Sequence, residues 1–208
     1  KEKLLFEHIV KAEKIVSKHV ITTPVVYSKV LSESIGEQVS LKLENQQITG
    51  SFKIRGAINA ISNLNPAQKK AGVVALSTGN HGRGLAFAAN LMKTRCIICM
   101  SKLVPNNKIE GIKALGAEVR LIGANQDEAQ LEADRLSTEE GMTYVSPFDN
   151  IDVIAGQGTL GLEIHRQIPE LNFAFVPLSG GGLICGVAKA LKGMTLSLIH
   201  ISEPTRPY

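Results

Sequence analysis

The chain has 208 residues, of which 44% are apolar, 20% charged and 4% aromatic, a composition typical of soluble globular proteins. Lys and Arg number 23 against 19 Asp and Glu, and the net charge of +4 comes without a basic block, which argues against a nucleic-acid partner. Apolar runs such as Cys96–Met100 fall far short of the roughly 18 residues that a membrane-spanning helix needs, so no membrane partner is expected.

The three cysteines do not predict a disulfide framework, because their number is odd and the chain is long enough to bury a core. The sequence opens without a secretory signal, so we expect a cytoplasmic location. Cys96 and Cys99 have the spacing Cys-x-x-Cys, but side chains three apart on a strand point to opposite faces. We therefore predict no metal site there, and we expect Cys185 to pack internally as well.

Both ends of the sequence look cut. Residues 1–20 read as the middle of a regular element, which predicts that a short N-terminal piece is missing. Residues 194–208 are predicted to be a non-native tail, with a native Pro-rich tail as the alternative, and Leu196–Tyr208 is excluded from fold prediction. Without the tail the chain stops just after a strand–loop–helix unit, so we expect a fragment.

The first third of the chain alternates between helical and strand patterns. Four apolar residues at three- and four-residue steps predict a first helix, namely Leu5, Ile9, Ala12 and Val16. Alternation over residues 39–43 predicts a half-buried strand with Val39, Leu41 and Leu43 on its buried face. Helical spacing returns over residues 54–64.

After Gly72 the pattern becomes regular. Strands are predicted at 73–76, 96–100, 119–122, 141–145 and 173–178. Helices are predicted at 82–92, 105–115, 127–140, 151–168 and 183–192. Such alternation is typical of parallel strands joined by right-handed helical crossovers, so the predicted class is α/β with a doubly wound sheet.

A glycine-rich bend, Ser179-Gly180-Gly181-Gly182, separates the last predicted strand from the last predicted helix. Residues without Cβ let backbone N–H groups converge on an anion, and the positive end of the following helix favours one, so phosphate is the expected guest. A simple tight turn is the alternative. Gly180, Gly182 and Gly186 only approximate the dinucleotide fingerprint, and no P-loop motif occurs.

Polar residues also follow the predicted strand 73–76, in the segment Ser77-Thr78-Gly79-Asn80-His81-Gly82. Hydroxyls, an amide and an imidazole beside the free N–H groups of a helix start suit a carboxylate or a phenolate-like oxygen. Helix capping is the simpler interpretation, because Ser, Thr and Asn are all favoured caps. We expect His81 to line a site rather than to act as a general base.

Lys53 lies between Phe52 and Ile54 at the start of an amphipathic helix. Partial burial and the positive helix end both disfavour its ammonium form, which would make it a better amine nucleophile. A solvated surface lysine is the alternative from local context alone.

Taken together, Ser-Phe-Lys-Ile-Arg-Gly-Ala (51–57), Ser-Thr-Gly-Asn-His-Gly (77–82) and Ser-Gly-Gly-Gly-Leu (179–183) resemble the serine/threonine dehydratase family. These fold type II pyridoxal-phosphate enzymes include threonine ammonia-lyases, serine racemases and the dehydratases of hydroxyectoine breakdown. The resemblance runs from about Val10 to Lys192. It implies two doubly wound, mainly parallel lobes of the tryptophan synthase β-like fold, with the large lobe (1–48 and 146–193) incomplete and a small lobe (49–145) inserted in it.

The resemblance also implies roles for individual residues. Lys53 would hold pyridoxal 5′-phosphate covalently and act as the catalytic base, with Phe52 beside the cofactor ring and Asn80 bonded to the ring oxygen. The phosphate would be held by the bend residues Ser179, Gly180, Gly181, Gly182 and Leu183. The substrate carboxylate would be held by Ser77, Thr78, Gly79 and His81. The family's partner for the pyridine nitrogen, its divalent-cation ligands and any regulatory domain would lie beyond the end of this chain.

The activity implied is that of a dehydratase, or ammonia-lyase, which eliminates water from threonine, serine or 3-hydroxyaspartate to give a 2-oxo acid and ammonia. Serine racemisation is one alternative, with Thr78 at the position of the second base. Cysteine-synthase-like β-replacement is another, and a dinucleotide-binding module is a third, from a different class. Arg55 or Arg83 would suit an additional substrate carboxylate, but a solvated helix face is preferred for both. The resemblance implies a homo-oligomer.

Overall fold

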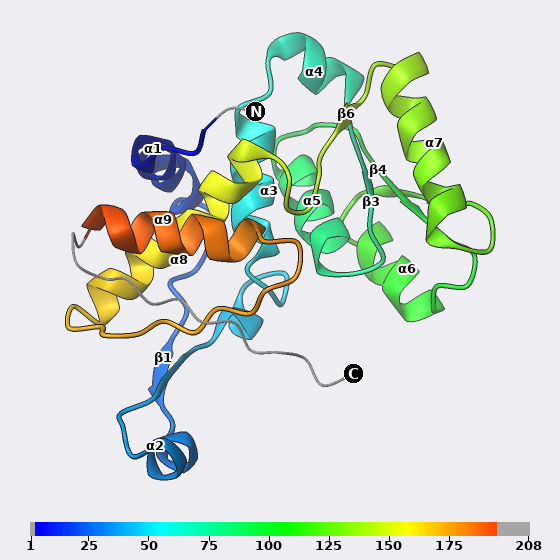
Figure 1. Cartoon of the computed structure of the whole chain (residues 1–208). Coiled ribbons are helices and arrows are strands. Elements are labelled where there is room, and N and C mark those ends of the chain that lie inside the picture. Colours follow the sequence, from blue (N-terminus) through cyan, green and yellow to red (C-terminus); the bar gives the residue numbers. More distant parts are fainter. Residues whose placement is uncertain (1–2, 195–208) are drawn as a thin grey trace.

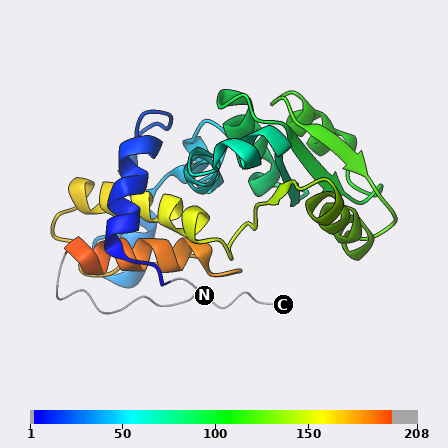
Figure 2. The ribbon, with the colours of Figure 1, turned by 90° about the horizontal axis from the view of Figure 1, so that it is seen from above.

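The computed structural model describes residues 3–194. Residues 195–208, most of the predicted non-native tail, lie outside this range. Figure 2 shows helices α1 (Phe6–Val16), α8 (Ile151–Gln167) and α9 (Gly182–Met194) gathered at one end and a sheet with its helices at the other. The helix α3 (Lys53–Ser62) lies between the two groups and packs against both. The predicted lobe division at 49 and 145 stays a prediction.

The sheet at one end confirms the predicted alternation. Its strands run in parallel in the order β5-β4-β3-β6, and they are β3 (Val73–Leu76), β4 (Cys96–Met100), β5 (Glu118–Leu121) and β6 (Thr143–Tyr144). The intervening helices are α5 (Asn80–Leu91), α6 (Asn106–Lys113) and α7 (Gln126–Glu139). Helix α7 covers one face of the sheet, while α3, α5 and α6 cover the other (Figure 1). Both faces are therefore buried, as continuous apolar runs such as 96–100 require.

The two-stranded sheet at the other end of the molecule differs from the prediction in which of its side chains are buried. Strands β1 (Val25–Tyr27) and β2 (Ser40–Lys42) pair in antiparallel fashion, so the predicted strand exists. Its predicted inward face is wrong, because Leu41 is 42% exposed while Lys42 turns toward Glu163. Lys42 donates hydrogen bonds to Glu163 and to the Thr23 carbonyl oxygen, so this side of β2 carries a buried ion pair instead of a leucine side chain.

The structure differs from the predicted elements in two further ways. The predicted strand at 173–178 is wrong: Phe173 and Phe175 are 60% and 73% exposed, and among the described residues no strand lies beside this segment to share its hydrogen bonds. Two short helices were not predicted, α2 (Lys29–Ile35) and α4 (Pro66–Ala71). Their signals are local caps, since Ser28 accepts a hydrogen bond from the Leu31 N–H and Asn65 forms a capping box with Gln68. A short 3-10 turn, η1 (Glu44–Gln46), precedes α3.

The helices α3, α8 and α9 approach one another closely because glycines line their contacts. A Cβ at Gly156 on α8 would lie 2.5 Å from the carbonyl oxygen of Arg55 on α3. A Cβ at Gly186 on α9 would lie 2.5 Å from the carbonyl oxygen of Ile154 on α8. These backbones touch where any larger residue would hold them apart.

Candidate active site

The strand order of the four-stranded sheet identifies a candidate site at its carboxyl-terminal edge, where the strands end. From β3 the chain proceeds through α5 to β4 and then to β5 on one side, whereas β6 pairs with the other side of β3. In an open parallel sheet, ligands bind in the crevice beyond the carboxyl ends of strands at which the order reverses. Here those ends are Ser77, which follows β3, and Val145, which follows β6.

Lys53 is the first residue of α3, and its side chain reaches this edge. Its Nζ donates a hydrogen bond to the Pro147 carbonyl oxygen at 2.9 Å and lies 5.3 Å from the centre of the Phe52 ring. Burial lowers the pKa of the Lys53 ammonium from its usual value, as the sequence predicted. The alternative of a fully solvated surface lysine is therefore wrong.

The segment after β3 begins the helix α5. Ser77 Oγ accepts a hydrogen bond from the Gly82 N–H at 2.9 Å, so Ser77 satisfies one free N–H group of the first turn, although Gly79 holds the N-cap position itself. Thr78 and Gly79 are half-buried, and Asn80 is exposed at the first position of the helix.

His81 is 4% exposed, and its Nε2 lies 2.8 Å from the Val145 carbonyl oxygen. A carbonyl oxygen only accepts, so Nε2 carries the proton and donates it, which leaves Nδ1 as an acceptor. Within residues 3–194 this buried Nδ1 has no hydrogen-bond partner. Burial lowers the pKa of His81 to about 4, so the imidazole is neutral at pH 7.

The glycine-rich bend lies at the start of α9. A Cβ at Gly180 would lie 2.2 Å from the Phe148 ring, and Gly181 has a φ of +87°, so neither position suits a residue with a side chain. The first N–H groups of an α-helix have no partner within the helix. Such N–H groups beside a bend can bind an anion, and this role for residues 179–182 stays a prediction.

The connection from β6 to α8 brings the three segments together. Val145 contacts His81, Pro147 accepts the hydrogen bond from Lys53, and Phe148 packs against Gly180. Helix α5 also approaches α3 directly, since a Cβ at Gly84 would lie 3.0 Å from the Lys53 carbonyl carbon. The part that residues 145–148 play in the site was not predicted from the sequence. Their position directly after the predicted strand 141–145 was a usable signal.

The structure corrects two expectations for charged and sulfur-bearing residues. Arg83 is exposed, as expected, but Arg55 is only 1% exposed, so it lies neither on a solvated face nor where a substrate carboxylate would reach it. Cys96 and Cys99 are buried on opposite faces of the sheet, as predicted, whereas Cys185 is exposed, so the expectation that it packs internally is wrong. An open pocket of about 470 Å³ lies between α1 and α8, and none of the predicted site residues lines it.

No three His, Cys, Asp or Glu side chains within residues 3–194 gather as the ligands of a metal ion do. No helix in the same range has the length and apolar character to cross a membrane.

The chain is similar in sequence and in structure to several known proteins. The L-threonine ammonia-lyase of Thermotoga maritima is 45% identical over 191 residues, which are 92% of this chain and 48% of that protein. Maize serine racemase superposes with a TM-score of 0.92 at 34% identity, covering 97% of this chain and 61% of that one. The processed form of threonine deaminase isoform 2 from Solanum lycopersicum gives a TM-score of 0.90 at 38% identity, covering 95% and 55%.

The chain spans about half the length of the curated relative and somewhat more than half of the two solved structures. The family model described as pyridoxal-phosphate dependent enzyme matches residues 16–205, most of the sequence. This match favours a pyridoxal-phosphate protein over the dinucleotide-binding alternative. The chain belongs to the family of pyridoxal-phosphate dependent enzymes and has the α/β architecture of their fold type II members.

Proposed function

We propose that the protein to which this chain belongs is a pyridoxal-phosphate dependent dehydratase that converts a β-hydroxy amino acid, such as threonine, serine or 3-hydroxyaspartate, into a 2-oxo acid and ammonia. The observation that carries the proposal is the half-buried Lys53 amine at the edge of the sheet where the strand order reverses. The relatives named threonine ammonia-lyase and threonine deaminase support this choice of reaction.

Three features of the chain fit the cofactor. Lys53 offers an amine whose pKa is lowered by burial, as a covalent attachment to an aldehyde needs. The bend at Gly180 and the start of α9 offer N–H groups for a phosphate. The buried Nδ1 of His81 has no hydrogen-bond partner within residues 3–194, as expected at a site that receives a polar group.

Each role can be assigned to residues of this chain. We assign cofactor attachment to Lys53, contact with the cofactor ring to Phe52 and Asn80, and phosphate binding to residues 179–183. We assign the substrate carboxylate to the N–H groups and side chains of residues 77–79 and of His81. When bound, pyridoxal phosphate supplies an electron sink that stabilises negative charge at the α-carbon of an amino acid.

Lys53 also moves protons in this proposal. Because burial lowers its pKa, a larger fraction of the side chain is the free amine at neutral pH, and it accepts the proton from the substrate α-carbon. The net reaction neither oxidises nor reduces the substrate. Water leaves from the α- and β-carbons, and water is consumed again when the released enamine hydrolyses to the 2-oxo acid and ammonium.

Racemisation is the second candidate, because maize serine racemase superposes on nearly the whole chain. It needs a second base on the opposite face of the α-carbon, and Thr78 occupies that place in the proposal. Its hydroxyl is held by a β-branched side chain with restricted rotamers, which favours elimination. Chiral analysis of serine incubated with the complete enzyme separates racemisation from elimination, and a sulfide assay detects β-replacement.

We also infer a cytoplasmic location. Cys96 and Cys99 are unpaired and buried, which fits a reducing compartment. Assembly into a homo-oligomer stays a prediction.

The test uses this chain itself. The purified chain is incubated with pyridoxal phosphate, reduced with borohydride, and mapped by mass spectrometry. We expect the adduct on Lys53 and its loss in Lys53→Ala, while Lys102→Ala, which removes an exposed lysine, leaves it unchanged. Ammonia release by the complete protein should then depend on Lys53. An adduct on another lysine, or none, would overturn the assignment.

A further inference from the structure

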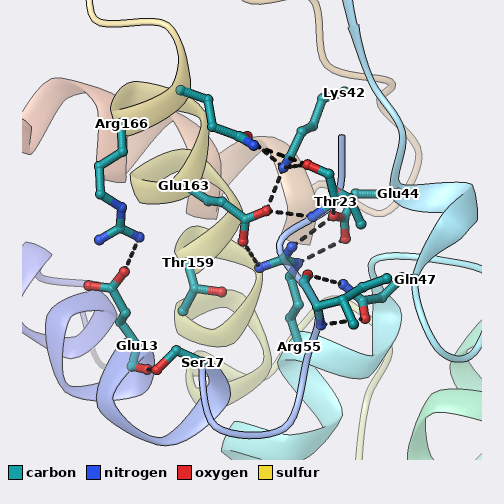
Figure 3. A network of polar contacts seen from close by, with 12 residues as sticks. Glu13, Ser17, Thr23, Lys42, Glu44, Gln47, Arg55, Thr159, Glu163 and Arg166 are labelled. Atoms are coloured by element: carbon teal, nitrogen blue, oxygen red, sulfur yellow. Dashed lines mark hydrogen bonds and ion pairs between the residues drawn. The ribbon is translucent and has the colours of Figure 1, made fainter. Parts of the chain in front are cut away.

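A cluster of buried charges lies behind α3, on the side away from the candidate site (Figure 3). Arg55 Nε and Nη2 donate to the two carboxylate oxygens of Glu44 at 2.8 and 2.7 Å, and Nη1 donates to Glu163 Oε2 at 2.9 Å. We call this trio the Arg55 clamp. It joins η1, α3 and α8, although Glu163 stands 108 residues after Arg55 in the sequence.

The clamp is nearly closed to solvent and balanced in charge. Arg55, Glu44 and Glu163 are 1%, 9% and 7% exposed. The remaining carboxylate oxygen of Glu163 accepts hydrogen bonds from Lys42 Nζ and from the Thr23 N–H, so two cations face two anions. Burial by itself would raise the pKa of Glu163, but the hydrogen bonds and charges of Arg55 and Lys42 outweigh burial and lower it.

Such a cluster is a costly way to gain stability. Removing two charged pairs from water costs about as much as their attraction returns, and apolar residues of similar volume often stabilise a protein at least as well. What a bidentate guanidinium pair adds is a fixed geometry, because its planar donors match a carboxylate in a single orientation. The clamp therefore specifies where the first turn of α3 lies.

That turn carries Lys53. Lys53 and Arg55 are the first and third residues of α3, and two residues correspond to about 200° around a helix, so their side chains leave on opposite sides. Lys53 extends to Pro147 and Arg55 to the clamp. Gly84 of α5 and Gly156 of α8 contact the same turn through its backbone, so it is held by α5, by α8 and by the clamp.

We propose that Arg55 is a positioning residue for Lys53: the Arg55 clamp fixes the first turn of α3 and thereby keeps the Lys53 amine half-buried against the Pro147 carbonyl. Arg55 itself touches no substrate. The chemical role of Lys53 rests on the proposed function, whereas its placement by the clamp does not.

The experiment compares Arg55→Lys with Arg166→Lys in the chain. Lysine at position 55 keeps the charge but cannot bind both oxygens of Glu44 and reach Glu163 as well. Arg166 pairs with Glu13 at the surface of α8, so Arg166→Lys is a matched loss of a guanidinium–carboxylate pair. Circular dichroism and urea unfolding establish that each variant is folded.

The first measurement needs no cofactor. Competitive acetylation with mass spectrometry over a range of pH gives the pKa of each lysine. In Arg55→Lys we expect the pKa of Lys53 to rise by at least half a unit toward its ordinary value, because the loosened turn exposes the amine. In Arg166→Lys we expect no change.

The second measurement is the rate at which pyridoxal phosphate is trapped on Lys53 by borohydride. We expect the rate at neutral pH to be lower by about threefold or more in Arg55→Lys, because a pKa higher by half a unit leaves about threefold less free amine. If Arg55→Lys does not fold, Glu163→Gln replaces it, since Gln keeps the shape and an acceptor oxygen but removes one charge. The same shifts are then expected, in the same direction and smaller.

The outcomes separate the two hypotheses. A folded Arg55→Lys, or Glu163→Gln in its place, with the wild-type pKa and trapping rate at Lys53 would show that the clamp is structural only and would overturn the proposal. A wild-type chain that forms no adduct on Lys53 would refute the proposed function, while acetylation still decides whether the clamp positions Lys53.

Discussion

The closest approach of α3 and α8 gives a stability prediction with a definite sign. In Gly156→Ala the new Cβ would lie 2.5 Å from the Arg55 carbonyl oxygen and 2.6 Å from Gly56 Cα, whereas ordinary contact begins near 3.4 Å. Both atoms belong to the backbone, so the helices must separate by about 0.9 Å, from 2.5 to 3.4 Å. Such overpacking costs about 1–3 kcal/mol, and a separation of this size weakens the surrounding contacts as well.

Alanine also gains about 1 kcal/mol over glycine in a helix, so we expect a net loss of about 1 kcal/mol in the free energy of unfolding. Urea unfolding measures it, and with a slope of about 2 kcal/mol per molar urea the midpoint should fall by about 0.5 M. Gly111→Ala in α6 is the matched control, because its Cβ meets only the flexible end of Arg83 at 3.7 Å. That variant should be more stable by about 0.5–1 kcal/mol. If both variants raise the midpoint, the tight contact between α3 and α8 is wrong.

Two further predictions concern titratable groups. The folded-state pKa of His81, about 4, lies below its unfolded value of 6.5. As the pH falls, the unfolded chain therefore binds a proton at a higher pH than the folded chain does. Stability from this group is complete above pH 6.5 and should be lost as the pH falls toward 4, by about 3 kcal/mol in total. Urea midpoints measured at pH 7 and pH 5 should fall less in His81→Asn than in the wild type, and equal falls would contradict the assignment. Burial raises the pKa of Cys96 to about 12 and that of Cys99 to about 11, so a thiol reagent should modify only exposed Cys185 in the native chain. Urea should release the other two thiols, and Cys185→Ser should abolish the native reaction.

Much of the fold could be predicted because its elements carry local signals. The runs 73–76 and 96–100 coincide with β3 and β4, since short continuous apolar runs between turn residues are typical of strands in a sheet buried on both faces. The segment 173–178 has the same local character but forms no strand among the described residues. A strand depends on a neighbour as well as on its own residues.

The candidate site was predicted in part. The motif around Lys53 predicted a partly buried amine, which the structure bears out, while anion binding at the bend 179–182 stays a prediction. The connection over residues 145–148 was missed, because its contribution is mainly backbone carbonyls that any residue would offer.

The sequence by itself determined most of the helices and strands, because the periodicity of apolar side chains is a local property. Only the tertiary structure decided where charges are buried. Arg55 was expected on a solvated face, yet Glu44 and Glu163 enclose it. A guanidinium leaves water only where carboxylates from distant segments converge on it, and no pattern within one helix specifies that convergence.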